Sequence, residues 1–287
     1  MLRDEISVPM SIEEFRLLRD LIYEYCGIYY QDDNKFILQR RIAPRLQALR
    51  LPDFTEYYAF LRYDPRRREE LDDVIERITT NETYFFREDY QLDALKYEIL
   101  PEVAEAKRRG RHLTIWSAGC SSGEEVYSVI MILLEIGLFE GWDVRVFGND
   151  ISKRVLHIAR KGLYGRSSFR QTDPRYVRRY FRETDGKWQI KEEVKAFASF
   201  GMVNLMDESQ LAIVGEVDVV LCRNVLIYFD LASRKKVVTN FYRKLVKGGY
   251  LLLGHSESLL NLTTAFEIVH LEHDMVYRRP TGSTGQL

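Results

Sequence analysis

Apolar residues recur at spacings of three and four from Ser11 to about Thr79, which is the period of an amphipathic α-helix. Ser11 followed by Glu14 is a capping-box start, and Pro52 and Pro65 mark the starts or breaks of short helices. The pattern predicts a small all-helical N-terminal domain at residues 1–78. The recurring apolar positions are Phe15, Leu18, Ile22, Phe36, Leu38, Ile42, Leu46 and Leu49.

The pattern changes after about His112 into short β-rich runs that alternate with helical ones. The β-like runs include HLTIWSA, DVRVFGND, VDVVLCRN and GYLLLGH, and the helical runs include SVIMILLEI, SKRVLHIARKGL and DLASRKKVVTNFYRKL. This alternation predicts an α/β fold with a mostly parallel sheet and helices on both of its faces. The closing runs AFEIVHLE and HDMVYRR predict a terminal hairpin that adds an antiparallel strand.

Between Leu163 and Phe200 the regular alternation of β-rich and helical runs is lost. Asp185-Gly186 is a favourable hairpin turn between RRYF and KWQI. We therefore expect a small antiparallel β subdomain at about 165–200, inserted into a main domain that spans residues 79–280. The tail, residues 281–287, is predicted to be disordered.

Composition narrows the classes of function. The 287 residues include 42 Lys and Arg against 43 Asp and Glu, so no global field favours nucleic acid or an anionic membrane. Cys26, Cys120 and Cys222 form no Cys/His cluster, which argues against a zinc site or a disulfide framework. No stretch has the roughly 18 to 20 apolar residues that a membrane span needs. We expect a cytoplasmic protein, without a metal, that acts as a monomer.

The first candidate site is the segment WSAGCSSGEE, which follows a strand and opens a helix. Gly119 and Gly123 permit a tight turn and a close approach of the backbone to a ligand. Glu124 and Glu125 at the helix start would repel a pyrophosphate, so a ligand with an ammonium group suits the site better. Alternatively, the serines and glutamates only cap the helix.

The second candidate is Asp150, which ends the next predicted strand, where an acidic side chain can accept hydrogen bonds from ribose hydroxyls. It could equally be the N-cap of the helix that follows.

Two further segments combine polar and aromatic residues. Asn81, Thr83 and Arg87 lie beside the aromatic run Tyr84-Phe85-Phe86, a composition suited to lining a pocket, although an interdomain packing segment would look similar. Asn224 and Tyr228 follow an apolar strand in the segment CRNVLIYFD, where they would face a cleft, although such aromatic residues are more often part of a core.

Together these segments resemble the chemotaxis receptor methyltransferase (CheR-type) family from about Ile12 to Arg279. The resemblance rests on a set of motifs in the family's order: TTNETYFFRE, WSAGCSSGEEVYS, NDISKRVLHIARKGLYG, the Asn204-Leu205 of MVNLMD, CRNVLIYFD and KGGYLLLGHSESL. It implies a class I methyltransferase domain that uses S-adenosylmethionine and esterifies glutamate side chains of chemotaxis receptors. S-adenosylhomocysteine is the implied second product.

The resemblance also implies roles for individual residues. Glu125 would hold the amino group of the cofactor, with Glu124 as its competitor, and Asp150 would hold the ribose. Arg87 and Tyr228 would lie nearest the methyl group. The other implied cofactor contacts are Asn204 and Leu205 beside the adenine, Asn81, Thr83 and Arg87 on the linker side, and Asn224 and Val225 closing the pocket.

A basic stretch in the helical domain is a candidate docking surface for the receptor's helical bundle. Residues 36–50 carry Arg40, Arg41, Arg45 and Arg50 with no acidic residue. Complementary charge would steer a glutamate-bearing helix toward it, although a solvated basic face would have the same sequence.

The β subdomain departs from the family's pattern. Family members that tether to a receptor's C-terminal pentapeptide use this subdomain, and the segment from Arg182 to Phe200 is slightly shorter here. We therefore expect no dependence on a tether. A competing hypothesis from another class is a cofactor-sensing interaction module without transferase activity. A third is a related methyltransferase that acts on a different carboxylate or on a small molecule. The roles of His255, Ser256 and Glu257 stay open between pocket lining and helix capping.

Overall fold

The computed structural model describes residues 8–282 and divides the chain into two compact units. The first extends to Thr80 and also contains the short segment Tyr228–Asp230, and the second contains Asn81–Ile227 and the chain from Leu231 onward. Within the tail that the sequence predicts to be disordered, residues 283–287 lie outside the described residues.

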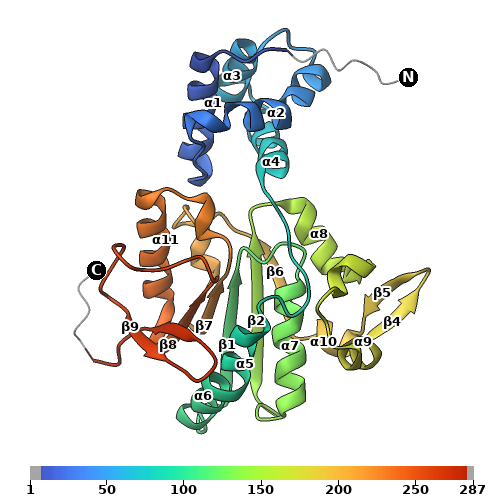
Figure 1. Ribbon diagram of the computed structural model, residues 1–287, viewed down its shortest axis with the longest axis vertical. Coiled ribbons are helices and arrows are strands. Elements are labelled where there is room, and N and C mark those ends of the chain that lie inside the picture. The colour runs from blue at the N-terminus through green and yellow to red at the C-terminus, as the bar shows by residue number, and fades with distance from the viewer. Residues whose placement is uncertain (1–7, 283–287) are drawn as a thin grey trace. The chain divides into compact units, whose positions relative to one another are not determined.

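The first unit is helical (Figure 1). Its helices are α1 (Ile12–Cys26), the short η1 (Asp32–Asn34), α2 (Lys35–Leu49), α3 (Phe54–Tyr63) and α4 (Arg67–Ile78). The predicted capping box is present, because the Ser11 hydroxyl accepts from the Glu14 amide and the Glu14 carboxylate accepts from the Ser11 amide. Phe36 differs from the prediction, since its side chain is 68% exposed rather than part of the apolar stripe.

Residues Tyr228–Asp230 pack with this helical unit although they come from the second half of the sequence. Phe229 forms an isolated antiparallel bridge with Ile28, and the Tyr29 amide donates to the Tyr228 carbonyl oxygen at 3.2 Å. The Tyr23 hydroxyl lies 3.1 Å from a carboxylate oxygen of Asp230. These contacts explain why the segment belongs to the first unit.

The second unit is built on a seven-stranded sheet with the order β6-β2-β1-β7-β8-β10-β9. The five strands from β6 to β8 run parallel, and β10 is antiparallel to both of its neighbours. This confirms the predicted parallel sheet with a terminal antiparallel hairpin. The strands are β1 (His112–Ala118), β2 (Asp143–Asp150), β6 (Ala198–Met202), β7 (Val217–Cys222), β8 (Leu245–Leu253), β9 (Glu267–His270) and β10 (Met275–Arg278).

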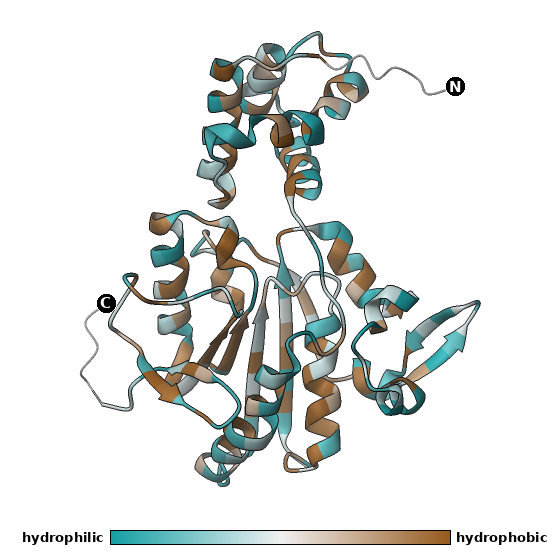
Figure 2. Cartoon of the chain, in the orientation of Figure 1, coloured by the Kyte–Doolittle hydropathy of each residue, from teal (hydrophilic) through white to brown (hydrophobic). Residues whose placement is uncertain are grey.

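Helices cover this sheet, with α7 (Glu124–Ile136) and α8 (Lys153–Lys161) packed against β2 and β6, and α11 (Leu231–Lys244) against β8. Every residue of β7 is buried, and Figure 2 shows the apolar colouring of β7 and of α7. A strand buried on both faces has no polar face, which is why apolar residues dominate its sequence, with the buried Asp218 as the exception. The remaining helices before β1 are α5 (Asp89–Ala94), η2 (Leu95–Ile99) and α6 (Leu100–Ala106).

The predicted β subdomain is a three-stranded antiparallel sheet with the order β3-β5-β4, formed by Leu163–Tyr164, Lys187–Ile190 and Phe181–Thr184. Asp185 and Gly186 both have positive φ, 50° and 68°, as a two-residue type I′ hairpin turn requires. The predicted strand RRYF is wrong except for Phe181, because helix α9 (Pro174–Tyr180) continues to Tyr180. The subdomain also contains η3 (Arg166–Phe169) and α10 (Glu192–Lys195), and η4 (Gln210–Ile213) and η5 (Leu226–Tyr228) follow it in the chain.

Candidate functional site

The candidate site lies where the order of the sheet reverses. Strands β1 and β7 are neighbours, and the chain connections lead away from them in opposite directions, so the loops at their carboxyl ends diverge. Ligands of open parallel sheets bind at such a point. The residues described below lie mainly in the loops after β1, β2, β6, β7 and β8 and in the segment before α5.

The loop after β1 is a tight turn that requires glycine. Gly119 has φ 81°, and its amide and that of Cys120 both donate to the Asn149 carbonyl oxygen, at 2.9 and 2.8 Å. A Cβ atom at Gly119 would lie 2.5 Å from Cγ2 of Val225. Only glycine therefore lets the loop after β1 approach the loop after β7 this closely.

Glu124 and Glu125 are adjacent in sequence but have different surroundings. The Glu124 side chain is buried and accepts from the hydroxyls of Ser122 at 2.7 Å and Ser168 at 3.0 Å, and burial raises the pKa of its carboxyl. The Glu125 carboxylate accepts from the Ser117 hydroxyl at 2.7 Å and from Arg223 at 3.0 Å. Glu125 thus lies at the strand ends, whereas Glu124 contacts the entry to the β subdomain.

Asp150 is 7% exposed and accepts from the amides of Ser121 and Ser152, each at 2.9 Å. The N-cap of α8 is Ser152, whose hydroxyl accepts from Val155. The capping role that was open for Asp150 therefore belongs to Ser152, and the Asp150 carboxylate instead braces the loop after β1.

Arg223 was not predicted as a site residue, although its guanidinium connects several of those that were. Its Nε donates to Gln91 at 2.7 Å, one Nη donates to Glu125, and the other donates to the Arg87 carbonyl oxygen and lies 3.4 Å from the Glu88 carboxylate. Its side chain is only 2% exposed. The signal available in the sequence is an arginine directly after the mostly apolar strand VDVVLC, because a buried arginine must be paired.

Glu257, whose role the sequence leaves open, is a second residue that links parts of the site. Its carboxylate accepts from the backbone amides of Asn224, Val225, Ile227 and Gly254. His255 of the same segment is exposed, and its amide lies 3.3 Å from Glu88. Glu257 therefore ties two loops together and, through the Ile227 amide, also caps the start of the short helix η5.

The segment before α5 contributes backbone and core contacts. The Asn81 carbonyl oxygen accepts from the Ser121 hydroxyl at 3.1 Å, and Arg87 donates to the Glu82 carbonyl oxygen at 3.0 Å. Phe85 and Phe86 are buried in the hydrophobic core, so the expectation that the aromatic run lines a pocket is wrong for both. Thr83 is half-buried.

The remaining predicted residues divide between the units. Asn204 and Leu205 follow β6 and are each 7% exposed. Asn224 has φ 59°, its Nδ2 lies 3.3 Å from Glu88, and its Oδ1 is buried with no hydrogen-bond partner in the described chain. Tyr228 belongs to the first unit, where its hydroxyl lies 3.5 Å from the Thr80 carbonyl oxygen, whereas Arg87 belongs to the second.

The four arginines of the basic stretch differ in their contacts. Arg45 forms ion pairs with Glu70 at 2.5 Å and Asp73 at 2.7 Å, and the Tyr57 hydroxyl donates to the same Glu70. Arg41 donates to the carbonyl oxygen of Ile78 and to the Thr80 hydroxyl. Arg40 and Arg50 are exposed.

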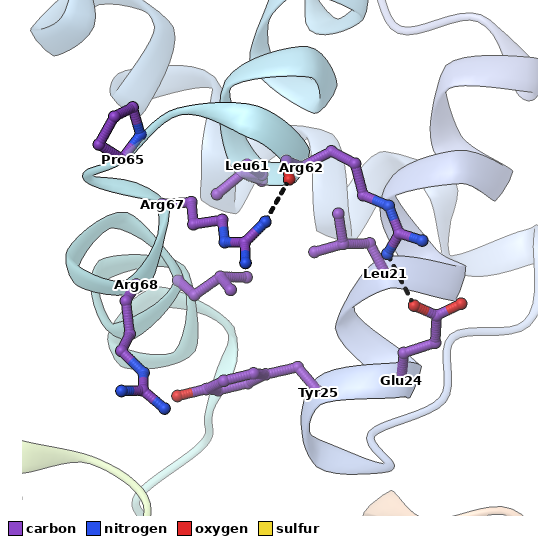
Figure 3. Close-up of a pocket in the computed structure, with 9 residues that line it drawn as sticks. Leu21, Glu24, Tyr25, Leu61, Arg62, Pro65, Arg67 and Arg68 are labelled. Carbon is purple, nitrogen blue, oxygen red and sulfur yellow. Dashed lines mark hydrogen bonds and ion pairs between the residues drawn. The ribbon is translucent and has the colours of Figure 1, made fainter.

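A separate pocket of about 670 Å³ lies within the first unit, between α1, α3 and α4 (Figure 3). Among its lining side chains, Arg62 forms an ion pair with Glu24 at 3.0 Å, and Arg67 donates to the Arg62 carbonyl oxygen. None of the residues predicted from the sequence to form a site lines it. The lining residues are Leu21, Glu24, Tyr25, Leu61, Arg62, Pro65, Arg67, Arg68 and Leu71.

Cys26, Cys120 and Cys222 are buried free thiols, and burial raises the pKa of each above its usual range. Within residues 8–282, no group of three or more His, Cys, Asp or Glu side chains could hold a metal ion. No helix in this described range is long and apolar enough to cross a membrane.

Comparison with known proteins agrees with the two-part architecture. Residues 81–275 match the model described as CheR methyltransferase, SAM binding domain, and residues 13–79 match CheR methyltransferase, all-alpha domain. SAM is S-adenosylmethionine.

Among curated relatives, chemotaxis protein methyltransferase 2 of Vibrio cholerae is 34% identical over 96% of this chain and 95% of the relative. The chemotaxis protein methyltransferase of Borreliella burgdorferi is 35% identical over 88% and 91%, and that of Salmonella typhimurium is 35% identical over 91% and 89%. Among solved structures, the N-methyltransferase NodS of Bradyrhizobium japonicum in complex with S-adenosylhomocysteine is 15% identical, with a TM-score of 0.41 over 71% of this chain and 92% of that one.

The family match also accounts for the sheet, whose order and terminal hairpin are those of a class I methyltransferase. With both domain models matched in order, and with relatives at about 35% identity over most of the chain, this protein belongs to the CheR methyltransferase family.

Proposed function

We propose that this protein transfers methyl groups from S-adenosylmethionine to glutamate side-chain carboxylates of methyl-accepting chemotaxis receptors, forming glutamate methyl esters and S-adenosylhomocysteine. The family supplies the methyltransferase activity, and the names of the relatives point to chemotaxis. The observation that best supports a bound cofactor is the buried Oδ1 of Asn224, which has no hydrogen-bond partner in the described chain. A buried acceptor without a partner is costly, so a donor from a ligand is expected there.

The residues at the strand ends fit S-adenosylmethionine. Glu125 and Asp150 provide acidic groups suited to an ammonium group and to ribose hydroxyls, and the close approach at Gly119 keeps the loop next to the ligand. The contacts of Glu125 with Ser117 and Arg223 favour it over Glu124 as the ammonium ligand, because Glu124 is held at the entry to the β subdomain. The other proposed cofactor contacts are Asn81, Thr83, Arg87, Asn204, Leu205, Asn224 and Val225.

The chemistry asks little of the protein beyond binding and alignment. The bound cofactor supplies a methyl group on a positively charged sulfur. A glutamate carboxyl group with a pKa of about 4.3 is already ionised at neutral pH, so no general base is needed. Holding the carboxylate in line with the bond between sulfur and methyl can lower the activation free energy by about 7 to 11 kcal/mol. We assign this orienting role to Arg87, whose side chain is 27% exposed and so can meet an incoming carboxylate.

The helical unit would dock the receptor's cytoplasmic helical bundle. Arg40 and Arg50 are exposed and can pair with acidic residues of such a bundle, whereas the ion pairs of Arg45 point to a structural role. We further propose that the protein acts in the cytoplasm as a monomer, without a metal and without the pentapeptide tether.

The decisive experiment measures transfer of labelled methyl from S-adenosylmethionine to a purified receptor cytoplasmic fragment. Label released as methanol in mild base identifies a carboxyl methyl ester. We expect Arg87→Ala to abolish transfer even when S-adenosylmethionine is saturating, and Arg145→Ala, at an exposed site on β2, to serve as the matched control. Tight cofactor binding without transfer to any receptor fragment would instead favour a cofactor-sensing module.

A further inference from the structure

The carboxylate of Glu257 sits in a cage of four backbone amides. Oε2 accepts from Asn224 at 2.8 Å and from Gly254 at 2.7 Å, and Oε1 accepts from Val225 at 2.9 Å and from Ile227 at 3.2 Å. These donors come from two loops, one after β7 and one after β8, which are adjacent parallel strands. One side chain thus joins the carboxyl ends of two central strands.

The loop that Glu257 holds carries groups of the proposed cofactor site. Asn224 is kept in the left-handed conformation, at φ 59°, with its Oδ1 buried and without a partner in the described chain. An asparagine in this conformation costs free energy unless its surroundings impose it. Val225 rests against Gly119 of the loop after β1, where an added Cβ would be 2.5 Å away. The Glu257 cage therefore sets the positions of both side chains.

A neutral residue could not replace this carboxylate. Each of its oxygens accepts two N–H groups, and such charge-assisted hydrogen bonds are about twice as strong as neutral ones. A glutamine amide has one accepting oxygen, so its NH₂ group would face two backbone donors. Burial raises the pKa of the Glu257 carboxyl, and the four donors oppose this shift by stabilising the charged form.

We propose that Glu257 is a positioning residue of the cofactor site, which holds Asn224 and Val225 in the arrangement that binds S-adenosylmethionine. This inference rests on the proposed function only in taking the strand ends as the cofactor site. It assigns to Glu257 no contact with the cofactor or with the reacting carboxylate.

Two variants test the cage independently. Glu257→Gln keeps the size of the side chain but loses two acceptor positions. Gly254→Ala keeps the carboxylate but places a Cβ 2.7 Å from the Asn224 amide nitrogen and 2.9 Å from Oε2 of Glu257, which must separate them. The matched controls are Glu272→Gln, at an exposed position, and Gly215→Ala, where an added Cβ meets nothing within 4 Å.

The readouts are S-adenosylhomocysteine affinity by calorimetry, hydrogen exchange by mass spectrometry and the thermal midpoint. We expect each cage variant to weaken binding at least about tenfold, with faster exchange confined to residues 224–227 and 254, while both controls match the wild type. Affinity equal to wild type in the cage variants would overturn the inference and leave the proposed function standing. Faster exchange throughout the second unit would show a general structural role, which also overturns it. Absence of binding by the wild type would overturn both.

Discussion

Arg223 and Glu125 form an ion pair of 3.0 Å at the carboxyl ends of β7 and β1, with the arginine side chain 2% exposed and the glutamate 15% exposed. The pair joins the proposed ammonium ligand to the segment before α5 through the Arg87 carbonyl oxygen and to α5 itself through Gln91. A buried charge that loses its partner is strongly destabilising. The geometry of the site therefore depends on a residue that contacts no proposed substrate.

We predict that Arg223→Met lowers the free energy of unfolding by about 3 to 5 kcal/mol, because it leaves Glu125 without its cationic partner. Urea unfolding at neutral pH measures this. Arg145→Met removes an exposed ion pair with Asp143 and should cost about 0 to 1 kcal/mol. Equal effects of the two substitutions would contradict the role assigned to the buried pair.

Substitutions of the two adjacent glutamates, Glu124 and Glu125, should affect cofactor affinity differently. We expect Glu125→Gln to weaken S-adenosylhomocysteine binding by about ten- to a hundredfold, since one charge-assisted hydrogen bond contributes about 1.5 to 3 kcal/mol. Glu124→Gln should bind nearly as wild type, because its contacts are with Ser122 and Ser168. Titration calorimetry measures both affinities. If Glu124→Gln weakened binding more than Glu125→Gln, Glu124 would be the ligand of the ammonium group.

Glu124 should also give the protein a recognisable dependence of stability on pH. Burial raises the pKa of its carboxyl above the ordinary value of 4.5, so the folded state binds the proton more tightly than the unfolded state. This tighter proton binding stabilises the folded state fully at pH values below the ordinary pKa of 4.5, and the stabilisation is lost as the pH rises through the raised pKa of Glu124. The free energy of unfolding of Glu124→Gln, relative to wild type, should therefore increase from pH 5 to pH 8. A constant difference would exclude this contribution.

Because Oδ1 of Asn224 has no partner in the described chain, removing it should weaken cofactor binding without unfolding the protein. Asn224→Gly removes Oδ1 and keeps the positive φ without strain, and its amide can still donate to Glu257. We expect S-adenosylhomocysteine to bind about five- to thirtyfold more weakly, equivalent to about 1 to 2 kcal/mol, with little change in the thermal midpoint. Unchanged affinity would mean that Oδ1 does not meet the ligand.

The basic stretch predicts a separation between docking and cofactor binding. Arg40→Glu combined with Arg50→Glu should slow methylation of a receptor fragment severalfold, more so at low salt, while S-adenosylhomocysteine affinity stays unchanged. Arg45→Glu should instead destabilise the helical unit, since it would place a carboxylate beside the buried Glu70. Loss of both methylation and cofactor binding in the double variant would contradict the docking role.

Tether independence predicts that a free receptor C-terminal pentapeptide does not bind this protein at micromolar concentration. Fluorescence anisotropy of a labelled peptide measures this directly, and deleting the pentapeptide from a receptor should leave its methylation rate unchanged. Micromolar binding would show that the shorter segment from Arg182 to Phe200 still forms a peptide site.

The parts of the fold that depend on local periodicity and turn chemistry could be predicted from the sequence. Helices α1 to α4 follow from apolar spacing and a capping box, the central strands from short β-rich runs that alternate with helical ones, and the hairpin turn from Asp185-Gly186. Each of these signals acts within a few residues. Phe36 was mistaken for a core residue because spacing alone does not say which apolar side chains the neighbouring helices cover.

Tertiary structure alone decided how polar groups are paired. The amides that surround Glu257 lie about thirty residues away in the chain or on the far side of a turn, and the partners of Arg223 come from segments about 100 residues earlier or more. Backbone donors have no signature in the sequence, because every residue except proline carries one. The sequence by itself therefore determined the elements, their order and the candidate ligand residues. Only the packing of distant strand ends, which buries these charges and forces them to find partners, determined which residues hold the site in place.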